Sequence, residues 1–196
     1  MQKQDILIVG VGGQGVVLAG NILAEAALAS GYDVKKSDTL GMAQRGGSVV
    51  SQLRFAEKVF SPLVAHRQAD IIIAFEKLEA ARFIPFLKKD GAVIINDLKL
   101  PPLSVSLGGA GYPEDDALLQ MIGAATKNIH IVEGSKRAAE LGNPRLLNTF
   151  MLGYASRFLP LKEETIKESI AASLPQKLRQ INIKAFEEGL KQACLS

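Results

Sequence analysis

The chain is poor in the residues that hold metals and form disulfides. It contains one cysteine, Cys194, two histidines, His66 and His130, and no tryptophan. A single thiol excludes an internal disulfide, a Cys₄ iron–sulfur site and a structural zinc site. The two histidines lie far apart in the sequence without a partner at metal-ligand spacing, and the chain has no G-x-S-x-G nucleophile motif. We therefore predict no metal site and no catalytic residue in this chain.

Strong net charge and long apolar runs are missing as well. Lysine and arginine total 23, aspartate and glutamate total 20, and the net charge of +3 is too small to favour a nucleic acid partner. The apolar runs 71–75 and 92–95 have the length of strands and are too short to span a membrane. Polar Gln2-Lys3-Gln4-Asp5 precedes the first apolar run, where a signal peptide would be hydrophobic. The composition, 47% hydrophobic and 22% charged, is typical of globular proteins, and we expect a cytoplasmic location without membrane contact.

The pattern that is present predicts an α/β fold. Apolar runs predict strands at 6–9, 33–36, 49–55, 70–75, 92–96 and 129–132, with a short hairpin that returns at 59–60. Helical periodicity predicts helices at 16–30, 76–87, 115–127, 135–141, 143–159, 162–173 and 181–193, the second of them closed by Lys88-Lys89-Asp90-Gly91. We expect a doubly wound, mostly parallel sheet in a Rossmann-like three-layer arrangement, with a helical C-terminal extension. Residues 1–196 would form one domain, in which 1–133 build the sheet and 134–196 are mainly helical.

The first strand runs directly into a glycine-rich turn. Gly10, Gly12 and Gly15 fit the pattern G-x-G-x-x-G, with Gly13 and Gln14 inside it, and a helix follows. We expect Gly10 to adopt a backbone angle that other residues avoid, Gly12 to let a ligand or chain approach, and Gly15 to let helix and strand pack closely. The amides at the start of the helix carry partial positive charge, so the turn suits a phosphate or a carboxylate.

A dinucleotide site of the usual kind would need an acid at the end of the second strand, about 20 residues past the glycines. That strand ends instead in Lys35-Lys36-Ser37, with Asp33 at its start and Asp38 just after it. Two lysines would suit the 2′-phosphate of NADP. They are equally well explained as solvated charges beside a loop, and both interpretations stay open.

A second glycine-rich segment, 41–48, joins the second and third predicted strands. In it Arg45 is followed by Gly46, Gly47 and Ser48. We expect this loop near the carboxyl ends of the strands, beside the first glycine loop, where open α/β sheets bind ligands. An arginine fork and exposed backbone amides suit phosphate or carboxylate. A flexible hinge with one solvated arginine is the alternative.

Together these motifs resemble the gamma-type domain of the 2-oxoacid:ferredoxin (or flavodoxin) oxidoreductases, and most closely the small subunits of the type that acts on indolepyruvate. The resemblance covers about 6–159 and, more loosely, the rest of the chain. It is carried by Gly10-Val11-Gly12-Gly13-Gln14-Gly15-Val16, Gln44-Arg45-Gly46-Gly47-Ser48-Val49-Val50-Ser51, Ser61-Pro62-Leu63-Val64, Ala69-Asp70, Phe75-Glu76-Lys77-Leu78-Glu79-Ala80-Ala81-Arg82, Asn96 and Asn148-Thr149-Phe150-Met151-Leu152-Gly153.

The resemblance implies a subunit that is inactive alone. Thiamine diphosphate and iron–sulfur clusters would belong to a large (alpha) partner subunit, and the chain would bind no cofactor by itself. The implied reaction is oxidative decarboxylation of an arylpyruvate, such as indolepyruvate, with coenzyme A as co-substrate. It yields an acyl-CoA, carbon dioxide and electrons that pass through the clusters to ferredoxin.

The resemblance also suggests roles for individual residues. Gly10, Gly12, Gly13 and Gly15 would cradle an anionic group or abut the large subunit, and Gln14 can donate and accept a hydrogen bond at that loop. A self-sufficient NADP-binding oxidoreductase and a pure interaction or regulatory domain are the alternatives.

Arg45, supported by Gly46, Gly47 and Ser48, is the candidate contact for a coenzyme A phosphate or for the neighbourhood of the partner's thiamine site. Lys35 and Lys36 are secondary candidates for the 3′-phosphate of coenzyme A. For Glu76 and Glu79, with Lys77 and Arg82, we expect a solvated helix face with local ion pairs.

Overall fold

The computed structural model describes residues 2–41, 46–101 and 111–195. In these ranges six strands form one sheet in the order β2-β3-β1-β4-β5-β6. Their bounds are β1 (Gln4–Val11), β2 (Asp33–Leu40), β3 (Ser48–Ala56), β4 (Ala69–Ala74), β5 (Leu87–Asn96) and β6 (Ile129–Val132).

The sheet is mixed, because one strand runs against the others. β1, β4, β5 and β6 pair in parallel, whereas β3 lies antiparallel between β1 and β2. β2 extends to Leu40, four residues beyond the predicted 33–36, and β3 begins at Ser48. The intervening stretch 41–47 is too short for the crossover that a parallel pair needs, which favours antiparallel pairing. The predicted hairpin that returns at 59–60 is wrong, because β3 finds its partners in β1 and β2 and no strand is assigned at 59–60. The doubly wound α/β fold with a helical C-terminal part is confirmed.

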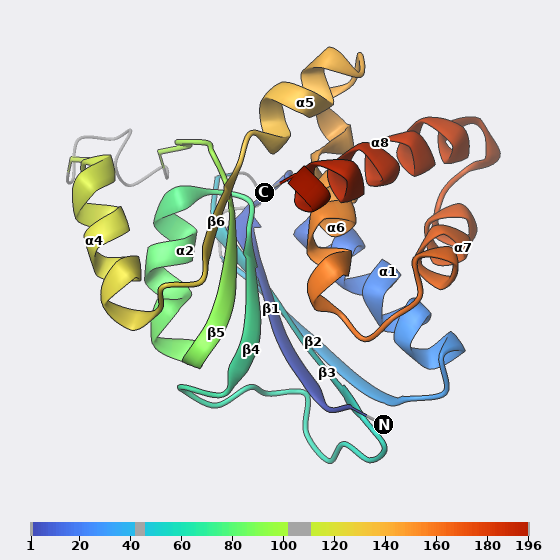
Figure 1. The fold of residues 1–196 in the computed structure, drawn as a ribbon, viewed down its shortest axis with the longest axis horizontal. Coiled ribbons are helices and arrows are strands. Elements are labelled where there is room, and N and C mark those ends of the chain that lie inside the picture. Colours follow the sequence, from blue (N-terminus) through green and yellow to red (C-terminus); the bar gives the residue numbers. More distant parts are fainter. Residues whose placement is uncertain (1, 42–45, 102–110, 196) are drawn as a thin grey trace.

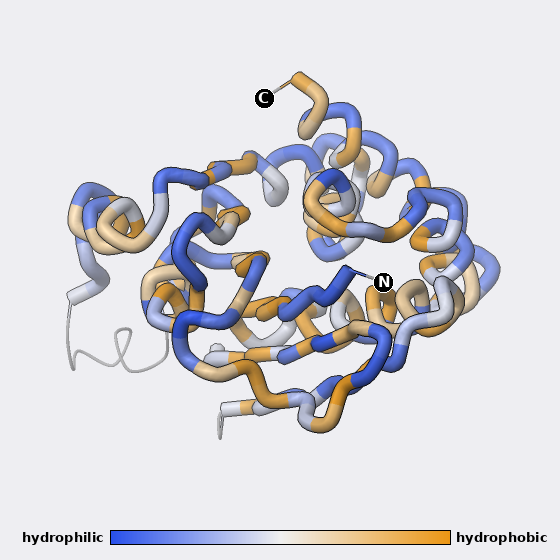
Figure 2. The backbone as a smooth tube through the Cα atoms, turned by 60° about the horizontal axis from the view of Figure 1, so that its bottom comes forward, coloured by the Kyte–Doolittle hydropathy of each residue, from blue (hydrophilic) through white to orange (hydrophobic). Residues whose placement is uncertain are grey.

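Helices cover both faces of the sheet (Figure 1). α1 (Val16–Ala29), α6 (Leu147–Ala155), α7 (Glu163–Ser173) and α8 (Gln176–Leu195) lie on one face, α2 (Lys77–Phe83) and α4 (Asp115–Ala125) on the other, and α5 (Gly134–Glu140) follows β6. Alternating residues of β1 supply the two cores, Ile6 and Ile8 on one face, Leu7 and Val9 on the other. The hydropathy colouring shows hydrophobic residues in strands and helices alike, while the N-terminal segment is hydrophilic (Figure 2).

The boundary between α2 and β5 differs from the prediction. α2 ends at Phe83, and a 3₁₀ turn with Pro85 follows, because proline provides no N–H to continue an α-helix. The run Lys88-Lys89-Asp90-Gly91, expected to close the helix, belongs to β5 instead. Its pairing with β4 shifts register there, and Asp90 has a φ of 63°. The polar run is therefore an irregularity at the start of a strand.

α6 and α8 cross with their backbones in contact. A Cβ built on Gly153 would lie 1.9 Å from the carbonyl oxygen of Phe186, and one on Gly189 would lie 2.0 Å from that of Phe150. Each helix therefore places a glycine against the other's backbone. α8 begins at Gln176, five residues before the predicted 181, because its polar first turns hide its start from apolar periodicity.

Candidate functional site

The glycine loop after β1 is tied into the sheet by the amide of Gln14. Its Oε1 accepts the N–H of Val11 at 2.7 Å, and its Nε2 donates to the carbonyl of Phe75, which follows β4, at 3.1 Å. The backbone N–H of Gly12 donates to Gly47 at 2.8 Å. The donor and acceptor capacity expected of Gln14 is thus used within the chain, and it fixes the loop in place.

Two of the glycines act differently from the expectation. Gly10 lies in extended β1 opposite Val49, and what requires glycine there is space, since a Cβ would lie 3.1 Å from the Cβ of Phe75. Left-handed backbone occurs at Gly13, with φ 102°, and at Gly15, with φ 83°.

Gly15 also makes a close approach, but not the predicted one. A Cβ at this position would meet the Asn148 side chain of α6 at 2.9 Å. The close packing expected between helix and strand is instead a contact between the loop and α6.

The second glycine-rich segment lies beside the first, as predicted. The Gly12–Gly47 hydrogen bond joins them. The N–H of Gly41 donates to the carbonyl of Ser48 at 2.8 Å and closes the base of the β2–β3 hairpin, which we call the hairpin neck. Gly46 has a φ of 78°. Arg45 falls outside the described residues.

Between the two loops lies a pocket of about 570 Å³. No charged side chain lines it within the described ranges, where its lining residues are Val11, Gly12, Gly13, Gly15, Val16, Val17, Leu40, Gly41 and Val49. Gly12 and Gln14 already donate their N–H groups within the chain, the latter to Val11 at 3.1 Å. The described part of the pocket thus offers aliphatic side chains and glycine backbone, with the first turn of α1 at its wall.

The segment after β4 is the centre of a hydrogen-bond network at the carboxyl edge of the sheet. The carbonyl of Phe75 accepts Gln14 and also the side-chain amide of Asn96, the latter at 3.0 Å. Asn96 ends β5 and in turn accepts the N–H of Ser135 at 2.9 Å. Residues scattered through the sequence motifs, Gln14, Phe75 and Asn96, therefore meet in one place.

The expectation of a solvated face at Glu76 and Glu79 is wrong, because both side chains are buried, each 1% exposed. Glu76 caps α2 by accepting the N–H of Glu79 at 3.0 Å. Its other oxygen accepts the N–H of Leu100, at 3.2 Å, and the hydroxyl of Tyr112. Burial, and to a lesser extent the hydrogen bond to Glu76, raise the pKa of Tyr112 well above its ordinary value. The hydroxyl therefore stays protonated and donates.

Glu79 links the same helix to the hairpin neck. One carboxylate oxygen accepts the Ser48 hydroxyl, and the other accepts Arg82 at 2.9 Å. Burial raises the pKa of Glu79 above its ordinary value, and the charge of Glu76 adds to the rise, while Ser48 and Arg82 act in the opposite direction. The only sequence signal for these roles was the motif itself, since acids three residues apart usually mark an exposed helix face.

The two lysines of β2 do not face this pocket. Lys35 pairs with Asp33 at 2.7 Å, and Lys36 pairs with Asp38 at 2.5 Å. In addition, β3 separates β2 from β1, whereas a dinucleotide fold places its second strand next to the first. Neither the lysines nor the topology favours an NADP site.

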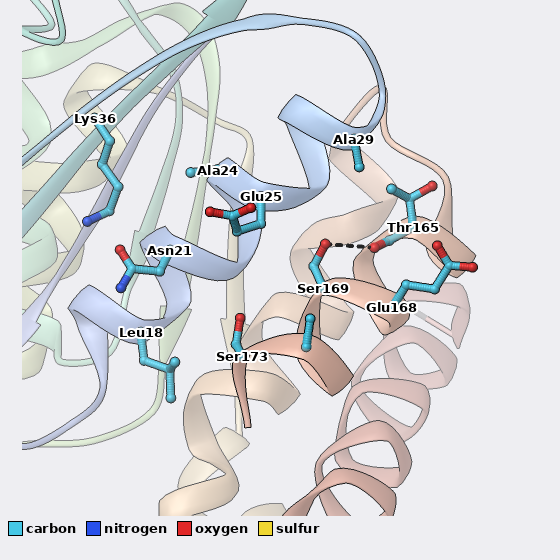
Figure 3. A pocket seen from close by; sticks show the side chains of 11 residues that line it. Leu18, Asn21, Ala24, Glu25, Ala29, Lys36, Thr165, Glu168, Ser169 and Ser173 are labelled. Atoms are coloured by element: carbon cyan, nitrogen blue, oxygen red, sulfur yellow. Dashed lines mark hydrogen bonds between the residues drawn. The ribbon is translucent and has the colours of Figure 1, made fainter. Parts of the chain in front are cut away.

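Lys36 instead lines a groove of about 840 Å³ between α1 and α7 (Figure 3). Its walls carry both Glu25 and Glu168, and the hydroxyl of Ser169 bonds to the Thr165 carbonyl at 2.9 Å. This larger hollow lies away from both glycine-rich loops, and its charges of both signs select no ligand class.

The described residues also bear on two other kinds of site. They hold no group of three or more His, Cys, Asp and Glu side chains able to bind a metal ion. None of their helices is both long and apolar enough to cross a membrane. His130 bonds to Asn128 at 2.7 Å and contacts Tyr154 and Phe158, in keeping with a packing role.

Solved structures share the fold of this chain. The gamma subunit of a keto/oxoacid ferredoxin oxidoreductase from Geobacter sulfurreducens PCA superposes with a TM-score of 0.73, at 21% identity, over 98% of this chain and 99% of that one. A 2-oxoglutarate:ferredoxin oxidoreductase from Magnetococcus marinus, solved with 2-oxoglutarate, coenzyme A and succinyl-CoA bound, gives a TM-score of 0.75 at 20% identity. It covers all of this chain, which corresponds to 32% of that longer chain. The fold is that of gamma-type subunits.

Sequence similarity then gives the family. Residues 5–192 match the family described as pyruvate ferredoxin/flavodoxin oxidoreductase, and the chain belongs to this family. The indolepyruvate oxidoreductase subunit IorB of Thermococcus kodakarensis is 41% identical over 98% of this chain and 97% of that protein. The subunit of the same name from Pyrococcus horikoshii is 38% identical over the same shares. The family resemblance deduced from the motifs is confirmed.

Proposed function

We propose that this chain is the small subunit of a thiamine-diphosphate-dependent indolepyruvate (arylpyruvate):ferredoxin oxidoreductase. The observation that carries the proposal is the match to IorB subunits along nearly the full length of both chains, at 41% identity in the Thermococcus protein. A large partner subunit would hold thiamine diphosphate and the iron–sulfur clusters, because the single cysteine of this chain cannot ligate a cluster. Thiamine diphosphate supplies the carbanion chemistry of decarboxylation. The cytoplasmic location stays a prediction.

Within this assembly, the pocket between the glycine-rich loops is the proposed contact for coenzyme A. Gly10 and Gln14 shape the loop, Gly12, Gly13 and Gly15 form its accessible backbone, and Gly46, Gly47 and Ser48 form the facing neck. The aliphatic lining suits an apolar part of the ligand, and the start of α1 suits an anionic part. Arg45 is the proposed phosphate contact. Lys35 and Lys36 are left out, since each already pairs with an aspartate.

The test is the reaction of the assembled enzyme. The complex should reduce ferredoxin with indolepyruvate only when coenzyme A and both subunits are present. Arg45→Ala should raise the KM for coenzyme A by about tenfold and change kcat much less, because a charge-assisted hydrogen bond is worth roughly 1.5 kcal/mol or more. Lys191→Ala, which removes an exposed cation on α8, is the matched control. An unchanged KM in Arg45→Ala removes this residue from the site, and full activity of the large subunit alone contradicts the proposed function.

A further inference from the structure

Ser48 connects three parts of the carboxyl edge. Its carbonyl accepts the N–H of Gly41, which closes the hairpin neck, and its hydroxyl donates to Glu79 on α2. The preceding residue, Gly47, accepts the N–H of Gly12 from the glycine loop. Gly12 and Gly41 both line the 570 Å³ pocket. The hydrogen bond that Ser48 donates to Glu79 therefore ties one wall of the pocket to α2, although Glu79 itself does not line the pocket.

The carboxylate of Glu79 is an unfavourable choice for stability alone. Its side chain is 1% exposed and sits beside Ala80 and Ala81, also buried. Its ion-pair partner Arg82 is 45% exposed, so the pair is only half-buried. An ionised carboxylate in such a place opposes folding, and an amide of the same shape would not. The advantage of the carboxylate is that both oxygens accept, one from Ser48 and one from Arg82, whereas an amide has one acceptor.

We propose that Glu79 is a positioning residue for the coenzyme A pocket: its ionised carboxylate holds the Ser48 hydroxyl and thereby keeps Gly47 against Gly12. This inference rests on the proposed function, because it takes coenzyme A as the ligand. The proposed coenzyme A site thereby gains a residue, Glu79, that lies on the opposite face of the sheet from α1. Tight binding of coenzyme A then requires that Glu79 is ionised.

The charged groups that face Glu79 define the pH response. Its charged neighbours are Arg82 on α2 and Glu76 at the N-cap of that helix, and the uncharged Ser48 hydroxyl of β3 donates to it. Because burial raises the pKa of Glu79, protonation begins at higher pH than for an exposed glutamate. A protonated Glu79 loses one of its two acceptor sites. The KM for coenzyme A should therefore rise on acidification in the native enzyme.

The first arm of the test uses the chain alone. Hydrogen–deuterium exchange, at one fixed pH high enough to keep Glu79 ionised, is compared between the native chain, Glu79→Met and the control Arg82→Gln. Methionine has nearly the length of glutamate but no oxygen to accept from Ser48, so exchange in Glu79→Met should be faster in peptides that contain the N–H groups of Gly12 and Gly41, while the melting temperature stays level or rises. Arg82→Gln keeps the acceptor for Ser48 and should match the native chain. Unchanged exchange in Glu79→Met overturns the inference, whatever the enzyme does.

The second arm uses the assembled enzyme. Glu79→Met, which cannot accept from Ser48, should raise the KM for coenzyme A about 2- to 30-fold, the range for residues that act through a neighbour. The value of kcat should stay nearly unchanged, and the pH dependence of KM should flatten. Faster exchange with a native KM overturns the inference, because Glu79 would then be structural only. Failure of the proposed function is visible in the native enzyme, as turnover that does not depend on coenzyme A, and the inference then falls with it.

Discussion

The carboxyl edge of the sheet and the crossing of α6 with α8 are both tightly packed, but in opposite ways. At the edge, Glu76 and Glu79 are each 1% exposed and fully engaged in hydrogen bonds, which brings ionisable groups into the interior. At the crossing, Gly153 and Gly189 let two backbones touch, and no charge is involved. The second arrangement favours stability, whereas the first is costly for stability and suits the positioning of a ligand. Substitutions in the two regions should therefore separate stability from function.

The largest expected effect is Gly153→Ala. The new Cβ would overlap the carbonyl of Phe186, so α8 must move away from α6, and the free energy of unfolding should fall by about 3 kcal/mol or more. Chemical denaturation measures it. The control is Gly123→Ala on α4, where the nearest atom would be 4.0 Å away and alanine should add about 0.5–1 kcal/mol. Equal effects of the two substitutions would disprove the close crossing.

Gly15→Ala should affect both regions, because Gly15 faces Asn148, and Asn148 belongs to the same helix as Gly153. Gly15 has a φ of 83°, and a Cβ there would lie 2.9 Å from the side-chain nitrogen of Asn148. The free energy of unfolding should therefore fall by about 1–3 kcal/mol. In the assembled enzyme the KM for coenzyme A should rise as well, since Gly15 lines the pocket. A loss of stability with native kinetics would place Gly15 among structural residues only.

The smallest effect, and the sharpest contrast, concerns pH. Burial raises the pKa of Glu79, so the folded chain holds that proton more tightly, and the stability that Glu79 contributes is lost as pH rises through the raised pKa. Burial lowers the pKa of His130 in the folded chain. The stability that neutral His130 contributes is therefore present above its ordinary pKa, and it is lost as pH falls through the pKa of the folded chain. Unfolding measured against pH should show a shallower acid-side loss in His130→Gln, and in Glu79→Gln a shallower loss as pH rises. The same sign for both residues would refute this assignment.

Local features of the fold were predictable from the sequence, and long-range ones were not. Apolar runs gave the strands, and the adjacency of the two glycine-rich loops followed from their places at strand ends. The insertion of β3 between β1 and β2 did not follow, because a run such as Val49-Val50 has the same pattern in either direction. The burial of Glu76 and Glu79 was missed because two acids followed by Arg82 fit an exposed helix face equally well. Only tertiary partners such as Ser48 and Tyr112 distinguish the two.

The most direct test of the account is an anaerobic purification of this chain from its native cells, with the co-purifying proteins identified by mass and their cofactors measured. The account predicts a stoichiometric large subunit with bound thiamine diphosphate and iron–sulfur clusters, which together with this chain oxidises indolepyruvate in the presence of coenzyme A. A chain that purifies alone, and that binds NADPH at micromolar concentration, would contradict it.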